Sequence, residues 1–232
     1  MISLALIGKG IQHSKSQKMY EELLLQKINY HLIDCYNEKE IPHLEELFSK
    51  YDGVSITSPY KTFFLNKLKL DNDVKKINAV NCIAKTDGDF RGFNTDLIAL
   101  EEIIQGYIKT YEELGFYILG DGVMSRLIIH ILNLKKIPFR IYSRKNCKDL
   151  QSISVTEKVK NEKKTFIVNC CSRNFIFKGT ANKEFIFWDM NYSFSAHQKS
   201  LPLIFEDYID GLSLLKLQAK YALNIWGIFN NK

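Results

Sequence analysis

The feature that most constrains what this chain can fold into is the alternation of short apolar runs with longer amphipathic ones. The runs ISLALIG, YHLIDCY and GVSIT are rich in aliphatic and β-branched residues and predict buried strands. The stretches 16–26, 41–50 and 123–134 carry apolar residues at helical spacing and predict helices. Strands that alternate with helices are typical of parallel sheets built from strand–helix–strand units. The sequence therefore predicts an α/β protein.

The remaining runs extend this alternation to the end of the chain. Four more strands are predicted from FYILG, FRIYSR, TFIVNCC and EFIFWDM, and a final helix from GLSLLKLQAKYALNIW. Between residues 78 and 96, two strands are joined by Asp87-Gly88, a dipeptide suited to a tight hairpin turn. A long helix that starts at Leu97 is the expected bridge between two lobes.

The distribution of charge argues against a polyanionic partner. The 232 residues carry a net charge of +6, and 46% of them are hydrophobic, enough for a sizeable core. The lysines are scattered among acids, and the chain has no arginine-rich run and no stripe of basic and aromatic residues. Nucleic acid binding is marked by such a patch. We therefore expect a small-molecule substrate and no nucleic acid.

Targeting and redox features indicate a cytoplasmic protein. The first ten residues enter a strand-like run directly, without the basic and long apolar regions of a signal peptide. No apolar run approaches the ~18 residues of a membrane span. The five cysteines form no C-x-x-C pair and no zinc-like cluster, so we expect reduced thiols and no metal site. The sequence leaves open a monomer or a homodimer.

A nucleotide-binding turn is predicted after the strand FYILG. Gly120-x-Gly122-x-x-Ser125 stands between that strand and the helix 123–134, the context that a dinucleotide fingerprint requires. Gly120 allows a tight turn, Gly122 allows close approach of a pyrophosphate, and Ser125 is small enough for helix–strand packing. The first turn of the helix then offers N–H groups and partial positive charge to that phosphate.

The end of the next strand bears on which dinucleotide binds. An NAD site is expected to carry an acid about 20 residues after the glycines. Here that region carries Ser143, Arg144, Lys145 and Lys148 and no acid. A guanidinium binds phosphate oxygens as a fork and stacks on flat rings. The motif favours the 2′-phosphate of NADP(H) at Arg144, with a solvated strand end as the alternative.

Small polar side chains gather at predicted strand ends in the first half of the chain. Each of them alone is more often a turn or cap residue than a ligand. Together, many hydroxyl and amide groups with one acid and one base suit a polyhydroxylated acid as the substrate. These residues are Ser14, Ser16, Thr57, Lys61, Asn81, Asn94 and Asp96.

The order of these motifs resembles that of the shikimate dehydrogenase family over nearly the whole chain, from Ile7 to Trp226. The family segments H-S-x-S-P, N-V-T-x-P-x-K, G-A-V-N-T and G-x-N-T-D correspond to HSKSQ, SITSPYK, NAVNC and GFNTD. The segments G-A-G-G-A-[AS]-R and N-R-T-x-x-[RK] correspond to GDGVMSR and SRKNCK. Finally, N-A-T, D-x-x-Y-x-P and D-G-x-x-M-L-x-x-Q-[AG] correspond to NCC, DMNYSF and DGLSLLKLQA. Such ordered agreement is far more specific than any single motif.

The resemblance implies two α/β lobes separated by a cleft. Residues 1–98 are implied to form the substrate-binding and catalytic domain, completed by a C-terminal helix in 211–232. Residues 99–210 are implied to form a Rossmann-like NADP-binding domain.

The resemblance also implies roles for particular residues. Lys61 and Asp96 are the implied catalytic pair. The implied substrate contacts are Ser14, Ser16, Thr57, Asn81, Tyr192 and Gln218, with the two serines on the carboxylate. The implied cofactor-binding residues are Gly120, Gly122, Val123, Ser125, Ser143, Arg144, Lys148 and Gly211, the last near the nicotinamide.

The chain departs from the family pattern in places and is shorter than is usual for the family. Tyr20 and Glu21 replace a histidine and an asparagine, and Ser55 replaces an asparagine. Further departures are Gln17, Asn78, Cys82, Val123, Ser143, Lys145, Phe194 and Leu214. None of these changes touches the implied catalytic pair or the hydroxyl and amide ligands. They bear more on the cofactor than on the substrate pocket.

The activity implied by the resemblance is the reversible NADPH-dependent reduction of 3-dehydroshikimate to shikimate, in the aromatic amino-acid (chorismate) pathway. The reaction needs a hydride from the cofactor and a proton from a side chain within about 3 Å of the ketone oxygen. The sequence leaves open which of Lys61 and Asp96 transfers that proton. It also leaves open a dehydrogenase that prefers quinate or another hydroxy acid, and a non-catalytic, NADP-binding regulatory homologue.

Overall fold

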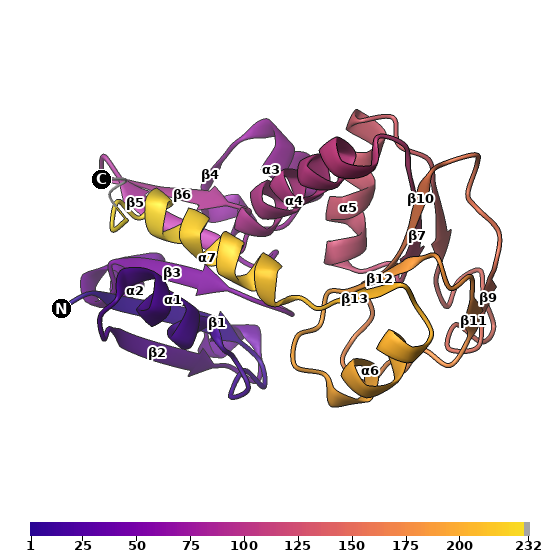
Figure 1. Cartoon of the computed structure of the whole chain (residues 1–232). Coiled ribbons are helices and arrows are strands. Elements are labelled where there is room, and N and C mark those ends of the chain that lie inside the picture. Colours follow the sequence, from indigo (N-terminus) through magenta and orange to yellow (C-terminus); the bar gives the residue numbers. More distant parts are fainter. Residues whose placement is uncertain (230–232) are drawn as a thin grey trace. The chain divides into compact units, whose positions relative to one another are not determined.

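The computed structural model describes residues 1–229 and divides into two compact units. Unit 1 comprises residues 1–99 and the chain from Leu215 onward, and unit 2 comprises Leu100–Leu214. The sequence places the boundaries at 98/99 and 210/211, one and four residues from these divisions. Both divisions fall inside helices, α4 (Thr95–Tyr111) and α7 (Leu212–Ile225) (Figure 1). Residues 230–232 of the predicted C-terminal segment lie outside the described residues, and the predicted cleft stays a prediction.

Unit 1 is built on a six-stranded mixed sheet. Its strands are β1 (Ser3–Gly8), β2 (Asn29–Asp34), β3 (Gly53–Ile56), β4 (Lys69–Leu70), β5 (Cys82–Thr86) and β6 (Asp89–Phe93). They lie in the order β2-β1-β3-β5-β6-β4; β1 is parallel to both β2 and β3, and β5 is antiparallel to both β3 and β6. Asp87 and Gly88 join β5 to β6 with φ angles of 53° and 82°. Two positive φ angles are what a two-residue type I′ turn requires, so the predicted hairpin is confirmed.

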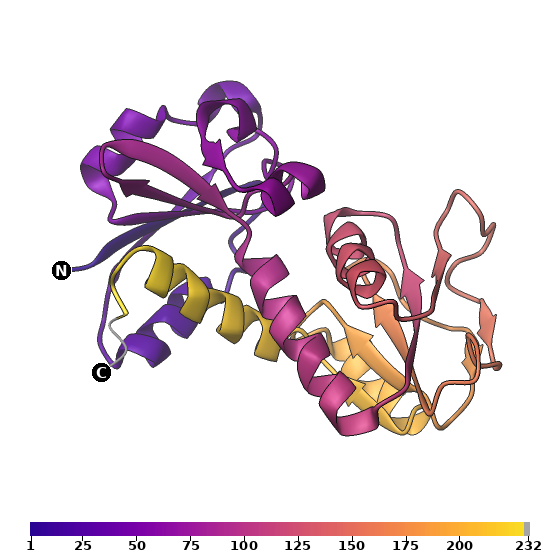
Figure 2. The same ribbon diagram turned by 90° about the horizontal axis from the view of Figure 1, so that it is seen from above.

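Helices cover both faces of this sheet. Its helices are α1 (Ser16–Leu24), α2 (Leu44–Lys50) and α3 (Asn72–Ile77), with α7 returning from the end of the chain and short 3-10 turns η1 (Glu38–Glu40) and η2 (Leu65–Lys67). Helices α1 and α7 pack on one face, where Tyr20 and Leu223 meet Leu4 (Figures 1 and 2). Helices α2 and α3 pack on the other face, against Ile7. Because successive strand residues point to opposite faces, β1 supplies both cores.

Two predicted helices differ from the observed ones at their ends. The helix predicted over 41–50 begins only at Leu44. Ile41 precedes Pro42 and is extended, with φ −75° and ψ 121°, because the proline ring disfavours helical backbone in the residue before it. The helix predicted over 16–26 ends at Leu24, and Leu25 is left-handed with φ 54°.

Unit 2 is built on a five-stranded parallel sheet. Its strands are β7 (Leu114–Leu119), β8 (Phe139–Tyr142), β10 (Lys164–Asn169), β12 (Ile186–Asp189) and β13 (Asp207–Ile209). The predicted helix α5 (Val123–Leu134) is confirmed and connects β7 to β8. The strands lie in the order β13-β12-β10-β7-β8. From β7 the chain passes to β8 on one side, and it then crosses to β10, β12 and β13 on the other side of β7. Ligands of such sheets bind outside the carboxyl ends of the strands at this switch point.

The two faces of this sheet are covered in different ways. On one face, the Tyr107 ring of α4 lies 4.7 Å from that of Phe166 and edge-on to Trp188. On the other face, the connections 143–163 and 170–185, all of them described, contain no helix. They contribute the small parallel pair β9 (Ser154–Val155) and β11 (Thr180–Ala181), and α6 (Ser195–Ser200) and η3 (Leu201–Leu203) follow β12. Aromatic side chains fill the core on this face: Tyr117, Phe175, Phe177, Phe185, Phe187 and Phe205.

Three observations on residues 1–229 bear on targeting, redox state and metals. No helix in this range is long and apolar enough to cross a membrane. The cysteines in this range are free thiols. No group of three or more histidine, cysteine, aspartate or glutamate side chains in this range is placed to hold a metal ion. The absence of a metal from the protein stays a prediction.

Gly53 of β3 lies against Trp226, whose indole N–H donates to the carbonyl oxygen of Ile83 at 2.8 Å. A Cβ at position 53 would come within 2.2 Å of the indole ring. We predict that Gly53→Ala lowers the free energy of unfolding by about 1–3 kcal/mol through overpacking, measured by urea denaturation.

The matched control is Gly106→Ala in α4, where the new Cβ meets no described atom within 4 Å. Alanine in an unobstructed helix position is expected to stabilise the protein by about 0.5–1 kcal/mol. If both substitutions changed stability in the same direction, the close packing of Trp226 on Gly53 would be contradicted.

Candidate active site

Lys61 and Asp96 form a shielded ion pair in unit 1. Lys61 Nζ lies 2.7 Å from Asp96 Oδ2, and the two side chains are 11% and 13% exposed. In other pairs one partner is exposed to solvent: the lysine of Lys27–Glu21 is 86% exposed, and the glutamate of Lys164–Glu206 is 51% exposed. A charge pair held away from water interacts more strongly than one in bulk solvent. This lysine is therefore set apart from the surface lysines by its environment.

Backbone and core contacts fix the turn that carries Lys61. The turn follows β3 and includes the cis peptide bond Ser58–Pro59. The Thr57 N–H donates to the Ile7 carbonyl oxygen at 2.9 Å, and the Lys61 carbonyl oxygen accepts from Val80 N–H at 2.7 Å. Tyr60 is 4% exposed, and burial raises the pKa of its hydroxyl, which donates to the Cys35 carbonyl oxygen. Lys61 thus follows a residue anchored in the core.

Asp96 stands in the first turn of α4, where the helix dipole favours a carboxylate. The helix start is capped by Asn94, which is 1% exposed. Its Oδ1 accepts from Leu97 N–H at 3.0 Å, and its Nδ2 donates to the Ala79 carbonyl oxygen at 2.9 Å. Among the polar residues noted in the sequence, Asn94 therefore caps a helix and positions Asp96.

A buried threonine joins the two implied amide ligands. Thr95 is fully buried, and its N–H donates to Asn81 Oδ1 at 2.7 Å. Asn81 Nδ2 donates to Thr95 Oγ1 at 3.0 Å, and that hydroxyl donates to Gln218 Oε1 at 3.0 Å. Sequence reasoning missed Thr95, although it stands in GFNTD between Asn94 and Asp96.

The bonds of Thr95 determine which hydrogen-bonding groups of Asn81 and Gln218 are available to a ligand. Both amide oxygens are engaged by Thr95, and Gln218 Nε2 donates one hydrogen to the Leu215 carbonyl oxygen at 3.1 Å. An amide nitrogen carries two hydrogens. One N–H of Asn81 and one of Gln218 are left over from these bonds. The pair is therefore set to donate to oxygen atoms of a ligand.

The implied carboxylate site lies at the start of α1. Ser14 and Ser16 place their hydroxyl oxygens 3.2 Å apart, and Ser16 N–H donates to Ser14 Oγ at 3.3 Å. One helical turn beyond Ser16, the buried Tyr20 hydroxyl lies 3.1 Å from Ser55 Oγ of β3. Two departures from the family pattern, Tyr20 and Ser55, are thus hydrogen-bonded to each other. Thr57 is the first residue after β3.

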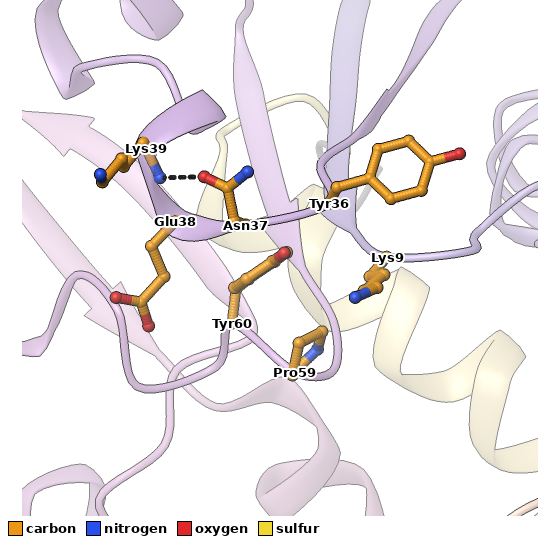
Figure 3. A pocket seen from close by; sticks show the side chains of 7 residues that line it. All are labelled: Lys9, Tyr36, Asn37, Glu38, Lys39, Pro59 and Tyr60. Atoms are coloured by element: carbon orange, nitrogen blue, oxygen red, sulfur yellow. Dashed lines mark hydrogen bonds between the residues drawn. The ribbon is translucent and has the colours of Figure 1, made fainter.

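A separate hollow of about 620 Å³ opens at the carboxyl ends of β1, β2 and β3 (Figure 3). Its lining residues are Lys9, Tyr36, Asn37, Glu38, Lys39, Pro59 and Tyr60. Asn37 Oδ1 accepts from Lys39 N–H at 3.0 Å, so this amide serves the local turn. None of the predicted site residues lines this hollow, which is therefore distinct from the site described above.

The glycine turn of unit 2 fits a dinucleotide phosphate. Gly120 has φ 106°, a conformation that favours glycine, and a Cβ there would lie 3.3 Å from Cys170 and Cys171. Gly122 is the N-cap of α5, where the described chain supplies no side-chain cap, and a Cβ there would meet no described atom within 4 Å. An uncapped helix start with open space beside its N-cap residue suits the binding of a phosphate.

Most of the other predicted cofactor residues lie in the first turn of α5 or in the turn after β8. Ser125 is fully buried in α5, which suits the predicted packing role, and Val123 is half-buried. Ser143 shapes the turn after β8, since its Oγ accepts from Lys145 N–H at 3.2 Å. Arg144 and Lys148 are exposed. The residues present thus fit an anionic dinucleotide, with cations available at the end of β8.

Tyr192 and Gly211 lie in unit 2, on neighbouring loops. The Gly211 N–H donates to the Asn191 carbonyl oxygen at 3.1 Å, and a Cβ at 211 would lie 2.5 Å from the Met190 carbonyl oxygen. The Tyr192 carbonyl oxygen accepts from Arg173 Nη1 at 2.9 Å, and the guanidinium lies over its ring. Glycine at 211 is therefore required for this close approach.

A fully buried carboxylate fixes the loop before Tyr192. Asp189 accepts from Asn169 Nδ2 at 2.9 Å and from the Asn191 N–H at 2.9 Å. His197 Nδ1 lies 2.6 Å from the other carboxylate oxygen, and its Nε2 accepts from Phe177 N–H at 3.0 Å. Because Nε2 is an acceptor, Nδ1 carries the hydrogen that is donated to Asp189. Sequence reasoning did not single out this network.

Comparisons with known proteins agree with the motif order. The family model described as the shikimate dehydrogenase substrate binding domain matches residues 6–83. A shikimate dehydrogenase (NADP(+)) of Methanococcus aeolicus is 34% identical over 135 residues, which cover 54% of this chain and 47% of that protein. A shikimate dehydrogenase (NADP(+)) of Clostridium botulinum is 27% identical over an alignment of 265 positions, which covers 97% of this chain and 96% of that protein. The crystal structure of the Thermus thermophilus shikimate 5-dehydrogenase in complex with NADP(H) and shikimate superposes with a TM-score of 0.71 at 19% identity, covering 97% and 93%.

These likenesses differ in what they establish. The chain spans about half the length of the first of these relatives, but nearly the full length of the second. The structural likeness, at 19% identity, establishes the fold of both units. Residues 6–83 match the substrate-domain model, and nearly the whole chain aligns with a shikimate dehydrogenase at 27% identity. In sequence, the chain is therefore similar to the shikimate dehydrogenases over nearly its full length, and both findings support membership of that family.

Proposed function

We propose that this protein is an NADP-dependent oxidoreductase that reversibly reduces 3-dehydroshikimate to shikimate, in the aromatic amino-acid (chorismate) pathway. The observation that carries the proposal is the shielded Lys61–Asp96 pair at 2.7 Å, which adjoins the Asn81–Thr95–Gln218 network in a chain similar to this family. Relatives named shikimate dehydrogenase (NADP(+)) and the Thermus thermophilus complex with NADP(H) and shikimate support the choice of substrate and cofactor.

Unit 1 is proposed to bind the substrate. Ser14 and Ser16 donate hydroxyl hydrogens to the carboxylate, and Thr57 contacts a ring hydroxyl. Asn81 and Gln218 each donate the N–H that the Thr95 network leaves over. Several hydroxyl and amide donors, together with the carboxylate of Asp96 as an acceptor, suit a ring with several hydroxyl groups. Tyr192 of unit 2 is proposed as the remaining substrate contact.

The Lys61–Asp96 pair is proposed to handle the proton. A bound NADPH supplies the hydride to the carbonyl carbon. Lys61, held by Asp96, directs an N–H at the ketone oxygen, stabilises the negative charge that develops there and provides the proton. Asp96 keeps the ammonium oriented, and in the reverse direction it helps the pair take the hydroxyl proton back. The two side chains therefore act as one unit.

Unit 2 is proposed to bind NADP(H). Gly120, Gly122, Val123 and Ser125, in the turn and the first residues of the helix, would hold the pyrophosphate, and Gly211 would lie near the nicotinamide. Ser143, Arg144 and Lys148 would hold the 2′-phosphate, with Arg144 as the main contact. A cytoplasmic location is also proposed, and the free thiols support it. A monomer and a homodimer both remain compatible with the site.

Steady-state assays with purified protein test this function. NADP⁺ reduction, followed by the absorbance of the reduced nicotinamide, is expected with shikimate. Faster turnover with quinate would assign a different hydroxy acid. Turnover with NAD⁺ alone would contradict the cofactor assignment. No turnover with any pair would favour a non-catalytic homologue and overturn the proposal.

Lys61→Ala is expected to lower turnover at least ~100-fold, the usual size of an acid–base contribution, while NADPH binding stays largely intact. The matched control is Lys69→Ala, which removes a surface lysine of the same unit that pairs with Asp89. Steady-state kinetics and an NADPH titration measure both effects. Unchanged turnover in Lys61→Ala would remove this residue from the mechanism.

Thr95→Val is expected to raise the KM for shikimate by up to about 30-fold, because two hydrogen bonds that orient Asn81 and Gln218 are lost, each worth about 1 kcal/mol. Thr95→Ser keeps the hydroxyl and is expected to stay within about threefold of the unmodified protein. Similar KM values for the two variants would show that the hydroxyl does not orient the amides.

Arg144→Ala is expected to weaken NADPH binding at least ~10-fold and NADH binding much less, because only NADPH carries the 2′-phosphate and a charge-assisted hydrogen bond to it is lost. A fluorescence titration with each dinucleotide measures both dissociation constants. Equal losses for the two would refute the 2′-phosphate assignment.

A further inference from the structure

An ion pair joins the glycine turn after β7 to the turn after β8. Asp121 stands between Gly120 and Gly122, and its Oδ2 lies 2.8 Å from Lys145 Nζ. The aspartate side chain is 43% exposed and the lysine 83%. Both residues also depart from the family motifs quoted above. Asp121 stands at the alanine of G-A-G-G-A, and Lys145 stands at the threonine of N-R-T.

This ion pair lies where a pyrophosphate would approach. The first turn of α5 begins at Gly122, beside which there is open space. Lys145, and to a lesser degree Arg144, lowers the pKa of the Asp121 carboxyl. Burial raises the pKa of the nearby Cys171 thiol, and the charge of Arg144 opposes that rise. The turn therefore holds one carboxylate with two cations close by.

A carboxylate in this position acts against any dinucleotide. Two like charges about 4 Å apart repel even in water, by roughly the equivalent of a fivefold loss in affinity. A neighbouring ammonium cancels most of that repulsion. The pyrophosphate is common to NAD and NADP, whereas the 2′-phosphate is present only in NADP. A cation that pairs with Asp121 therefore changes the affinity for both cofactors. A cation that binds the 2′-phosphate changes the affinity for NADP(H) alone.

We propose that Lys145 serves the glycine turn rather than the 2′-phosphate: it neutralises Asp121 beside the pyrophosphate, supports NADPH and NADH alike, and leaves the choice between them to Arg144. This proposal rests on the NADP-binding function proposed above. It gives the two neighbouring cations, Lys145 and Arg144, different roles in that function. The Asp121–Lys145 pair sets the overall affinity for dinucleotides, and Arg144 sets the selectivity.

Titrations of the full chain with NADPH and with NADH, followed by nicotinamide fluorescence at one ionic strength, test the proposal. Lys145→Gln is expected to weaken both cofactors about fivefold, and Asp121→Asn to strengthen both by a similar factor, the size of one close charge interaction in water. The double variant restores a neutral turn and is expected to return both dissociation constants to within about twofold of the original. The ratio of the two constants is expected to stay the same in all three variants.

The matched controls are Lys163→Gln and Glu112→Gln, which make the same charge changes at another ion pair of unit 2. They are expected to leave both affinities unchanged. A Lys145→Gln variant that lost NADPH affinity at least fivefold more than NADH affinity would make Lys145 a 2′-phosphate ligand and overturn the proposal. Unchanged affinity for both would overturn it as well. If the unmodified chain bound neither dinucleotide, the proposed function would fail first, and this inference with it.

Discussion

The hydrogen bonds of Thr95 are the interaction on which the site of unit 1 depends. This buried residue binds Asn81, which precedes β5, and Gln218, which lies on α7, more than a hundred residues later in the chain. The next residue is Asp96, so the same helix turn also holds the partner of Lys61. The Thr95 hydroxyl group thus joins the segment before β5, the start of α4 and the helix α7. The orientation of both amides, and with it the pattern of donors offered to a ligand, follows from this residue.

Much of the fold was predictable from local signals in the sequence. Asp87-Gly88 gave the hairpin because few other dipeptides accept two positive φ angles. The helix α5 followed from its apolar spacing and the glycines before it. The start of α2 was predicted too early, since the effect of Pro42 on Ile41 outweighed the apolar pattern. The two-residue strands β9 and β11 are too short to carry a period at all.

The candidate site was less accessible to sequence reasoning, because its contacts join distant segments. The pairing of Lys61 with Asp96 was expected from the family resemblance, but their shielding from solvent and the role of Thr95 were not. The hydrogen bond between Tyr20 and Ser55, 35 residues apart, appears in the sequence only as two unrelated departures. Nor does any local pattern show that Asp189 binds His197, or that aromatic side chains replace crossover helices in unit 2. Such contacts depend on tertiary packing, which periodicity does not encode.

The division of the chain has a consequence for its synthesis on the ribosome. Unit 2 is one continuous segment, Leu100–Leu214, so all of its residues are made before most of α7. Unit 1 is not continuous, because Ala219, Ala222 and Leu223 of α7 belong to the same core as Leu4 and Tyr20. Residues 1–99 are made before α7, so one face of their sheet lacks its α7 cover until that helix emerges. During that interval, the apolar face that α7 will cover is open to chaperones and to other nascent chains.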